Sequence, residues 1–369
     1  MIKPKIKHSN PEFEPLNKRK ERPATKPVRV GVVGLGRAGW HLHLLPMHAH
    51  EGFEIVAAAD PDASRAAEAA ELTGCRPFGS LRELLKGSDC ELVVVATPSH
   101  MHYEDISAVL KADRHCIAEK PMAMSSKDAL NLVALAKSRK RKLFVHHIHL
   151  HLPEYWNLKE VIDSGKIGPF FSIQGSWSNY ARRWDWQTLN KFGGGQLRNT
   201  CPHMLSIVLP LMGSKVKSVH ADLRHIKDAG DAPDHVHLVL EAQKGTTADV
   251  LVSSAMAFCG PQWIVSGRYG ACRIDAKKLS LRYYNPAEAP PLKLISNAAA
   301  PGRQYLREQL PWREEERELT PVTCGTFHEN VHDVLRHGAK PVVTPESAAE
   351  VVRIIEMAYA SSASRGQKA

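Results

Sequence analysis

The chain has 369 residues, which is long for one domain, so we expect two. Its composition, 43% hydrophobic and 24% charged, is that of a soluble globular protein, and no uncharged apolar run of about 18 residues predicts a membrane span. The net charge is +10, but residues 1–27 supply half of it and no basic stripe follows, which argues against a nucleic-acid-binding surface.

Residues 1–27 form a basic, proline-rich segment that lacks the apolar core of a secretory signal. We expect a flexible, solvated tail. The seven cysteines are scattered and include no C-x-x-C pair, so no zinc ribbon or redox motif is predicted. Reduced thiols in a cytoplasmic protein fit this pattern best.

Residues 28–148 alternate between apolar, β-branched runs and helix-compatible sequence. The predicted strands lie in "VRVGVVGLGRAGW", "FEIVAAADPD", "ELVVVATPSHMH", "HCIAEKPMA" and "KLFVHHIHL". This alternation predicts a parallel sheet with helices on both faces, the architecture of a Rossmann domain.

A G-x-G-x-x-G motif, formed by Gly34, Gly36 and Gly39, stands between the first strand and the first helix. In this context the glycines allow a tight turn, backbone approach to a pyrophosphate, and close helix–strand packing. Asp60 ends the next strand, at the spacing expected of an acid that binds ribose hydroxyls. We therefore predict dinucleotide binding, with NAD favoured; Arg65 is near enough that NADP is not excluded.

Residues 149–369 follow a different pattern. Longer strands that alternate polar and apolar residues are expected in "PFFSIQGSWSNY", "VKSVHADLRHI", "DHVHLVLEAQKG", "TADVLVSSAMAF" and "QWIVSGRYG". They predict an antiparallel sheet with one face buried. A proline- and alanine-rich stretch from Pro286 reads as a loop, and a last helix is predicted with Thr344 as its cap and Pro345 in its first turn.

Two further segments carry a family resemblance. The first, "ATPSHMHYEDISAVLKADRHCIAEKPMA", contains Thr97-Pro98, His102 and the triplet Glu119-Lys120-Pro121; the second is "GGGQLRNTCPHMLS". With the glycine motif they resemble the glucose–fructose oxidoreductase / inositol dehydrogenase (Gfo/Idh/MocA) family from about residue 28 to 366. The resemblance implies a Rossmann domain followed by an α/β domain with a large, mostly antiparallel, open-faced sheet.

The resemblance also implies ligands and assembly. Members bind NAD or NADP in the first domain and a sugar, polyol or related molecule between the domains, and they form homodimers or homotetramers through the open sheet face. Together with the glycine motif, the resemblance implies a set of cofactor-binding residues: Gly34, Leu35, Gly36, Arg37, Ala38, Gly39, Asp60, Thr97, Pro98, His102, Glu119 and Lys120.

Lys120 and His203 are the catalytic residues that the resemblance implies. Lys120 follows the end of a parallel strand, where open α/β sheets bind ligands, and matches the lysine that contacts the reacting hydroxyl near the nicotinamide. His203 matches the family's proton-transferring histidine, and a pKa near neutrality would suit that role. Gly193, Gly194 and Gly195 are expected to let the backbone approach the cleft closely.

The match to the family then breaks at two positions. Asn199 stands where the family usually has Asp, and Ser206 stands where a second Asp commonly follows the histidine. Three explanations are open: Lys120 alone is the base, Asn199 only recognises substrate hydroxyls, or the reaction is not simple alcohol oxidation. Cys201 replaces a motif glycine, and we do not expect it to act as a nucleophile.

Aromatic and imidazole side chains suggest how a substrate is held. His147, His149 and His151 alternate, so one face of an extended strand would present all three; metal binding and substrate contact are both conceivable, and we predict substrate contact at His149 and no metal site. Trp184 lies in the aromatic, charged segment "SNYARRWDWQTLNKF", which is typical of carbohydrate recognition. The predicted substrate-binding residues are Lys120, His149, Trp184, Asn199 and His203.

The leading hypothesis is an NAD(P)-dependent oxidoreductase that acts on a secondary hydroxyl of a sugar, polyol or sugar derivative. One alternative is an NAD-dependent glycosidase that works by transient oxidation and elimination. The other is a dinucleotide-binding sensor without catalytic activity. A small molecule is the expected partner in each case, without nucleic acid or membrane.

Overall fold

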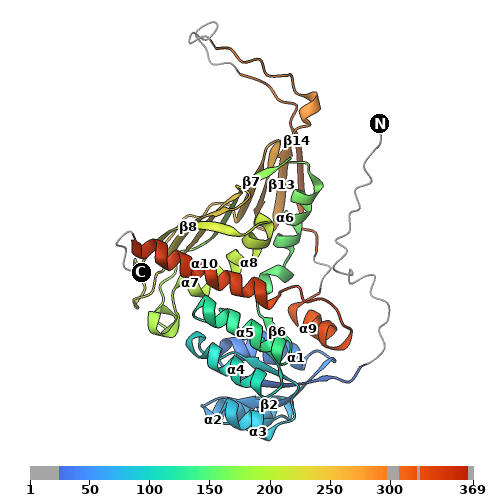
Figure 1. Ribbon diagram of the computed structural model, residues 1–369, viewed down its shortest axis with the longest axis vertical. Coiled ribbons are helices and arrows are strands. Elements are labelled where there is room, and N and C mark those ends of the chain that lie inside the picture. The colour runs from blue at the N-terminus through green and yellow to red at the C-terminus, as the bar shows by residue number, and fades with distance from the viewer. Residues whose placement is uncertain (1–24, 297–306, 322–324, 365–369) are drawn as a thin grey trace.

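The computed structural model describes residues 25–296, 307–321 and 325–364, so most of the predicted tail lies outside the described residues. A parallel sheet with its helices occupies one end of the molecule, and a larger sheet occupies the other (Figure 1). Helix α10 (Pro345–Ser364) runs between them and packs on both.

The first sheet is wholly parallel, with strand order β3-β2-β1-β4-β5-β6. Most residues of its central strands β1 and β4 are buried valines, as a sheet covered on both faces requires. Five of the strands were predicted; β3 was not, because three residues with a central proline carry little signal. The strands are β1 (Val28–Val33), β2 (Phe53–Ala59), β3 (Arg76–Phe78), β4 (Leu92–Val95), β5 (His115–Ala118) and β6 (Leu143–Val145).

Helices cover both faces of this sheet. Side-chain caps begin several of them: Asp62, Ser80 and Ser125 each accept a hydrogen bond from a backbone N–H of the first turn. The helical segments are η2 (Ala38–Leu44, a π-helix), α1 (Leu45–His48), α2 (Ala63–Thr73), α3 (Leu81–Gly87), η3 (Ser99–Met101), α4 (His102–Lys111) and α5 (Ser126–Ser138).

The second sheet has eight strands in the order β14-β13-β12-β11-β7-β10-β9-β8, antiparallel except for the β7–β10 pair. Alternating residues such as Val236, Leu238 and Leu240 are buried, which leaves the opposite face open. The predicted α/β fold class is confirmed. The strands are β7 (Phe170–Ser178), β8 (Val216–Arg224), β9 (His235–Ala242), β10 (Thr247–Ser253), β11 (Trp263–Gly267), β12 (Gly270–Asp275), β13 (Lys278–Tyr283) and β14 (Arg313–Glu318).

Helices cover one face of the second sheet. Thr344 caps α10 by accepting a hydrogen bond from the Ser347 N–H at 3.1 Å, as the sequence predicted. The remaining segments are η4 (Ile148–His151), α6 (Pro153–Ser164), η5 (Trp186–Thr188), η6 (Asn190–Phe192), α7 (Gln196–Asn199), α8 (Cys201–Met212), η7 (Pro286–Glu288) and α9 (Phe327–Arg336).

The chain returns to the first domain near its end. Phe327, Val331 and Val334 of α9 join the core that contains Val28 and Val30 of β1. The domain boundary predicted at residue 148 stays a prediction. A segment from beyond this boundary, α9, packs into the core of the first domain. Within the described segments, none of the helices has both the length and the apolar character needed to cross a membrane.

Candidate active site

The glycine motif forms a turn at the carboxyl end of β1. Gly34 has φ +84°, and a Cβ atom on Gly39 would lie 1.8 Å from the carbonyl oxygen of Gly34. Protein packing therefore requires glycine at both positions. A Cβ atom on Gly36 would meet nothing within 4 Å, so this glycine faces open space. The turn leaves the room that a dinucleotide pyrophosphate needs.

Asp60 lies beside this turn at the end of β2. Its carboxylate accepts the Leu35 N–H at 2.8 Å and the Asp62 N–H at 3.0 Å, and the residue is only 6% exposed. A guanidinium nitrogen of Arg65 lies 3.9 Å from the same carboxylate. The acid is thus fixed at the position where this fold binds ribose hydroxyls, with a cation close by.

His102 is buried and links two loops through both of its ring nitrogens. Its ring nitrogens lie 2.8 Å from the Thr97 carbonyl oxygen and 2.7 Å from the Pro121 carbonyl oxygen. The Thr97 hydroxyl donates to Asp105 at 2.7 Å. Both ring nitrogens of His102 are occupied, so its contribution to cofactor binding would come through the placement of the Thr97-Pro98 loop.

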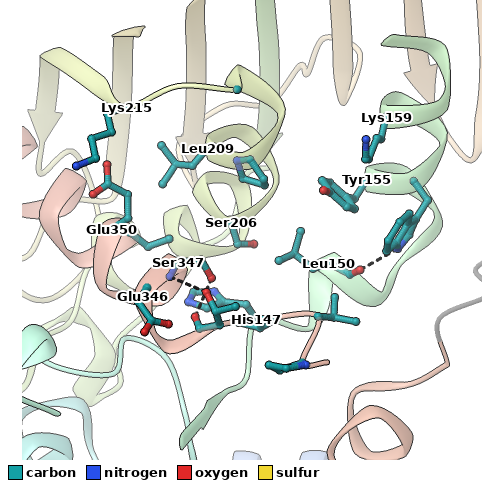
Figure 2. Close-up of a pocket in the computed structure, with 18 of the residues that line it drawn as sticks. His147, Leu150, Tyr155, Lys159, Ser206, Leu209, Lys215, Glu346, Ser347 and Glu350 are labelled. Carbon is teal, nitrogen blue, oxygen red and sulfur yellow. Dashed lines mark hydrogen bonds between the residues drawn. The ribbon is translucent and has the colours of Figure 1, made fainter. Parts of the chain in front are cut away.

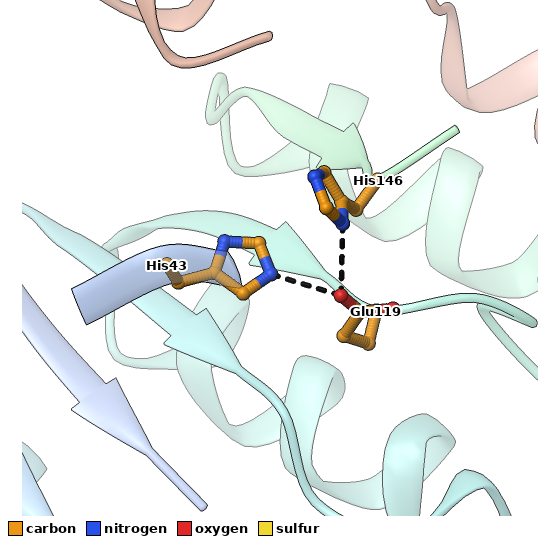
Figure 3. A group of neighbouring side chains, drawn as sticks. All are labelled: His43, Glu119 and His146. Carbon is orange, nitrogen blue, oxygen red and sulfur yellow. Dashed lines mark hydrogen bonds and ion pairs between the residues drawn. The ribbon is translucent and has the colours of Figure 1, made fainter. Parts of the chain in front are cut away.

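Glu119 lies in a buried group with His43 and His146 (Figure 3). One of its oxygens accepts from His43 Nε2 at 3.0 Å and from His146 Nδ1 at 2.8 Å, and the other accepts the Lys120 N–H at 3.1 Å. Burial opposes ionisation, but the two imidazoles outweigh it and hold the pKa of Glu119 well below its usual value. The three side chains also have the spacing of metal ligands, although hydrogen bonds account for their geometry.

Lys120 bridges the two domains. Its ammonium nitrogen donates to the Asn199 carbonyl oxygen at 2.7 Å and to Asn199 Oδ1 at 3.0 Å. Burial lowers the pKa of Lys120; Glu119 acts in the opposite direction, and the positive charges of Arg37 and Arg183 lower the pKa further. The amino group therefore loses its proton more readily than a free lysine does.

His203 lies in α8, in ring contact with His149. Their ring centroids are 4.4 Å apart, and Trp177 lies 5.1 Å from His149 and 5.9 Å from His203. Burial, reinforced by Lys120, holds the pKa of His203 well below its usual value. The prediction that His203 titrates near neutrality was therefore wrong, because the sequence does not show how deeply its ring is enclosed.

Burial also lowers the pKa of His149 to about 4 and that of His147 to about 3, so both rings are neutral at neutral pH. The linker that carries them is a 3₁₀ turn, not the extended strand we predicted. As a result His151 points elsewhere: its Nδ1 lies 3.0 Å from the Gly325 carbonyl oxygen, and its ring contacts Phe327. The three histidines do not share one face.

The three successive glycines shape the turn before α7. Gly193 and Gly195 have φ of +75° and +85°, and a Cβ atom on Gly194 would lie 2.3 Å from the Gln187 carbonyl oxygen. Other parts of the protein lie so close to this turn that a side chain would clash with them. Glycine is therefore needed here for protein packing as well as for the approach of a ligand. The turn sets Asn199, the last residue of α7, opposite Lys120.

Gln187 was not singled out from the sequence. Arg183 Nη2 donates to its Oε1 at 2.6 Å, and Asn199 Nδ2 lies 3.5 Å from the same atom. Trp177 was also missed, although alternation along β7 places it on the same face as the buried Ile173 and Gly175. The predicted Trp184, by contrast, is 83% exposed.

A cavity of about 790 Å³ lies between α6, α8 and the start of α10 (Figure 2). His147 and Ser206 line it, but Lys120 and His203 do not, so it is distinct from the place where Lys120 meets Asn199. Ser206 donates to the His203 carbonyl oxygen at 2.8 Å and thus replaces the family's acid without reaching the His203 ring. Burial raises the pKa of the Cys201 thiol, as expected of a structural cysteine.

Two family models match the chain. Residues 28–147 match the "Oxidoreductase family, NAD-binding Rossmann fold" model, and residues 155–273 match the "GFO/IDH/MocA C-terminal domain" model.

Among curated proteins, scyllo-inositol 2-dehydrogenase (NADP(+)) IolW of Bacillus subtilis is 26% identical over 349 residues, covering 91% of this chain and 94% of the relative. The 2,7-anhydro-N-acetylneuraminate hydratase of Escherichia coli is 27% identical over 258 residues, 68% of each chain.

Solved structures share the fold. An NAD-binding protein from Listeria innocua has a TM-score of 0.79 at 24% identity, covering 92% of this chain and 99% of its own. The WlbA dehydrogenase from Bordetella pertussis, solved with NADH and UDP-GlcNAcA, has a TM-score of 0.75 at 20% identity, covering 92% and 96%.

Proposed function

The chain belongs to the GFO/IDH/MocA family of NAD-binding oxidoreductases, and from this premise we propose that it transfers a hydride between NAD(P) and a secondary hydroxyl of a sugar, polyol or sugar derivative. The observation that carries the proposal is the position of Lys120. Its amino group leaves the end of a Rossmann strand, is half-buried, and meets the second domain at Asn199. A hydroxylated carbon held there would lie between a proton acceptor and the nucleotide fold.

Lys120 acts as the general base in this proposal. The neutral amine takes the hydroxyl proton while the C–H bond gives up its hydride, and a carbonyl is left on the substrate; reduction reverses these steps. When bound, NAD(P) would supply the hydride acceptor for oxidation or the hydride donor for reduction. Burial and the nearby guanidinium groups favour the neutral amine, which is the form that the base requires.

His203 and His149 orient the substrate. Both are neutral imidazoles, so each offers one N–H donor and one acceptor to sugar hydroxyls. Trp177 is 39% exposed beside them and provides an apolar surface for the C–H face of a ring. Contacts to substrate at Lys120, His149, His203 and Asn199 remain part of the proposal, and Trp177 takes the role predicted for Trp184.

The relatives support a hydroxyl-rich substrate. The Bacillus subtilis relative is named for scyllo-inositol and NADP, and the Bordetella structure contains a nucleotide sugar acid. For this chain we propose NAD as the preferred cofactor, because Asp60 would accept hydrogen bonds from ribose hydroxyls and repel a 2′-phosphate. The cofactor-binding set predicted from the motifs is retained, with Glu119 and His102 acting through loop placement.

A second candidate comes from the hydratase relative, whose name describes a reaction without net oxidation. Transient oxidation of one sugar carbon makes the neighbouring C–H acidic, so elimination can follow before the hydride returns. The same Lys120 amine would serve as base. Such an enzyme would form product without accumulating NADH.

We also propose that the chain forms homodimers or homotetramers through the open face of the second sheet. This face is lined by polar and half-buried side chains, for example those of Gln174, His237 and Asp249. Light scattering after gel filtration measures the assembly directly.

The test of the function is NADH absorbance with purified protein, NAD and a panel of polyols, aldoses and nucleotide sugars. Formation of NADH with at least one substrate, lost in Lys120→Ala, is the expected result. Product formation from glycosides or anhydro-sugars without NADH would select the second candidate. Tight NAD binding without turnover of any substrate would contradict both.

A further inference from the structure

Two side-chain amides lie in series between the amino group of Lys120, the proposed base, and the guanidinium group of Arg183. Lys120 Nζ donates to Asn199 Oδ1 at 3.0 Å, and Asn199 Nδ2 lies 3.5 Å from Gln187 Oε1. Arg183 Nη2 donates to the same oxygen of Gln187 at 2.6 Å. The series therefore runs from the base at the Rossmann strand to an arginine in the loop before α7.

The ends of this series fix the orientation of both amides. Ammonium and guanidinium groups are donors only, so each must face a carbonyl oxygen. Gln187 consequently directs its oxygen to Arg183, and that oxygen also attracts the NH₂ group of Asn199. With its NH₂ group directed to Gln187, the Asn199 amide presents its oxygen to Lys120.

We propose that Gln187 is a positioning residue, which holds the Asn199 amide with its oxygen toward Lys120 and thereby fixes the direction of the lysine side chain. This inference rests on the proposed function, because it assigns to Gln187 a role in the chemistry of Lys120.

The main chain of Gln187 has a separate, structural role. Its N–H donates to Asp185 at 2.9 Å, and its carbonyl oxygen accepts the Gly195 N–H at 2.8 Å. These bonds hold the loop and the glycine turn, and they do not involve the side chain. Substitution of the side chain therefore tests positioning with the loop support left in place.

Several charged or titratable groups face Lys120, and the test must allow for them. Glu119 precedes it, Arg37 comes from the glycine turn and Arg183 from the loop before α7. The imidazoles near it are His147, His149 and His203, which are neutral at neutral pH. Gln187 and Asn199 are uncharged. A carboxylate introduced at Gln187 is therefore the only charge that differs between the variant and the wild type.

Gln187→Met removes the acceptor but keeps the side-chain length, and Gln187→Glu keeps the acceptor and adds a negative charge. In the methionine variant the Asn199 amide is free to turn its NH₂ toward Lys120, which disfavours the ammonium. We expect the pKa of Lys120 to fall by about one unit. We also expect kcat to fall about 10-fold, because the amine is no longer held in its working direction and not because less of it is neutral, with the KM for NAD unchanged. In the glutamate variant the pKa should rise by about one unit, with kcat recovered above that pH.

The pKa of Lys120 is read without turnover, by competitive acetylation of the full-length protein across pH and mass spectrometry of the Lys120 peptide. Gln196→Met is the matched control. Gln196 lies in α7 and lines the same small pocket as Arg183, Gln187 and Asn199, and its side chain joins none of the hydrogen bonds found in the described segments. Thermal unfolding of each variant checks that the fold is kept.

Shifts of opposite sign in the two Gln187 variants, absent in the control, support the proposal. An unchanged Lys120 pKa in both Gln187 variants would overturn it, as would a wild-type kcat in Gln187→Met. Should the opposite shifts occur in a protein that oxidises no substrate, the positioning role stands and the proposed function fails. The glutamate variant keeps the test valid if the methionine variant does not fold.

Discussion

Replacing Asn199 with aspartate restores the residue that the family usually has, and we expect it to impair the enzyme at neutral pH. Asn199 Oδ1 accepts from Lys120 Nζ at 3.0 Å, so Asn199→Asp places a carboxylate directly against the proposed base. At this distance and an effective dielectric constant of about 20, two unit charges attract by about 5.5 kcal/mol. Desolvation of the new carboxylate offsets part of this attraction.

Opposite charges at such distances commonly shift a pKa by about 1–3 units, and each unit corresponds to about 1.4 kcal/mol. The carboxylate stabilises the ammonium, so the pKa of Lys120 rises and less neutral amine is present at a given pH. The ascending limb of kcat/KM against pH should therefore move about 1–3 units toward alkaline pH. Below the limb, activity falls about 10-fold per unit, and it recovers at higher pH.

The assay is the pH profile of kcat/KM for wild type and Asn199→Asp with one polyol or sugar substrate. A limb that stays in place or moves toward acid would refute Lys120 as the base. The absolute position of the limb is a second check. If His203 were the base, the wild-type limb would lie at acid pH, because burial holds its pKa well below the usual value.

Three further substitutions test other parts of the site. Lys120→Ala should leave the Kd for NAD nearly unchanged by calorimetry and lower kcat by about 10²–10⁴-fold; wild-type turnover would remove Lys120 from the mechanism. Gly36→Ala should weaken NAD binding at least about 10-fold at an unchanged Tm, because its Cβ atom would meet no protein atom. Gly39→Ala, whose Cβ atom would clash with the backbone, should instead lower the free energy of unfolding by about 1–3 kcal/mol, as measured by chemical denaturation. Trp177→Ala should raise the substrate KM about 3–10-fold while the exposed Trp184→Ala leaves it unchanged; equal effects would contradict the assignment of Trp177.

The local parts of the fold were predictable because short-range patterns encode them. The glycine turn, the buried strands and the Thr344 cap each depend on residues within a few positions of one another. The strands β12 to β14 were not predicted individually, because they are short or highly charged and their pairing is set by neighbours in the sheet. Trp177 could have been found, since the period of two along β7 places its side chain on the buried face.

The chemistry of the site was less predictable, because it depends on contacts between distant segments. The bond between Lys120 and Asn199 joins residues 79 positions apart. The low pKa of His203 follows from burial beside Lys120, His149 and His147, none of which is its neighbour in sequence. Residue identity suggested which groups belong to the site. The shifts of their pKa values depend on packing between distant segments, which the sequence does not show.

These protonation states give the departures from the family pattern a common explanation. Aspartate at position 199 would stabilise the lysine as an ammonium, whereas asparagine accepts the same hydrogen bond without the charge. The neighbouring imidazoles are neutral, and the two nearby guanidinium groups, on Arg37 and Arg183, disfavour a third cation at Lys120. Glu119 is the acid that acts in the opposite direction, and it is already shared between His43 and His146. The site thus lowers the pKa of Lys120, as the proposed role of this lysine as proton acceptor requires.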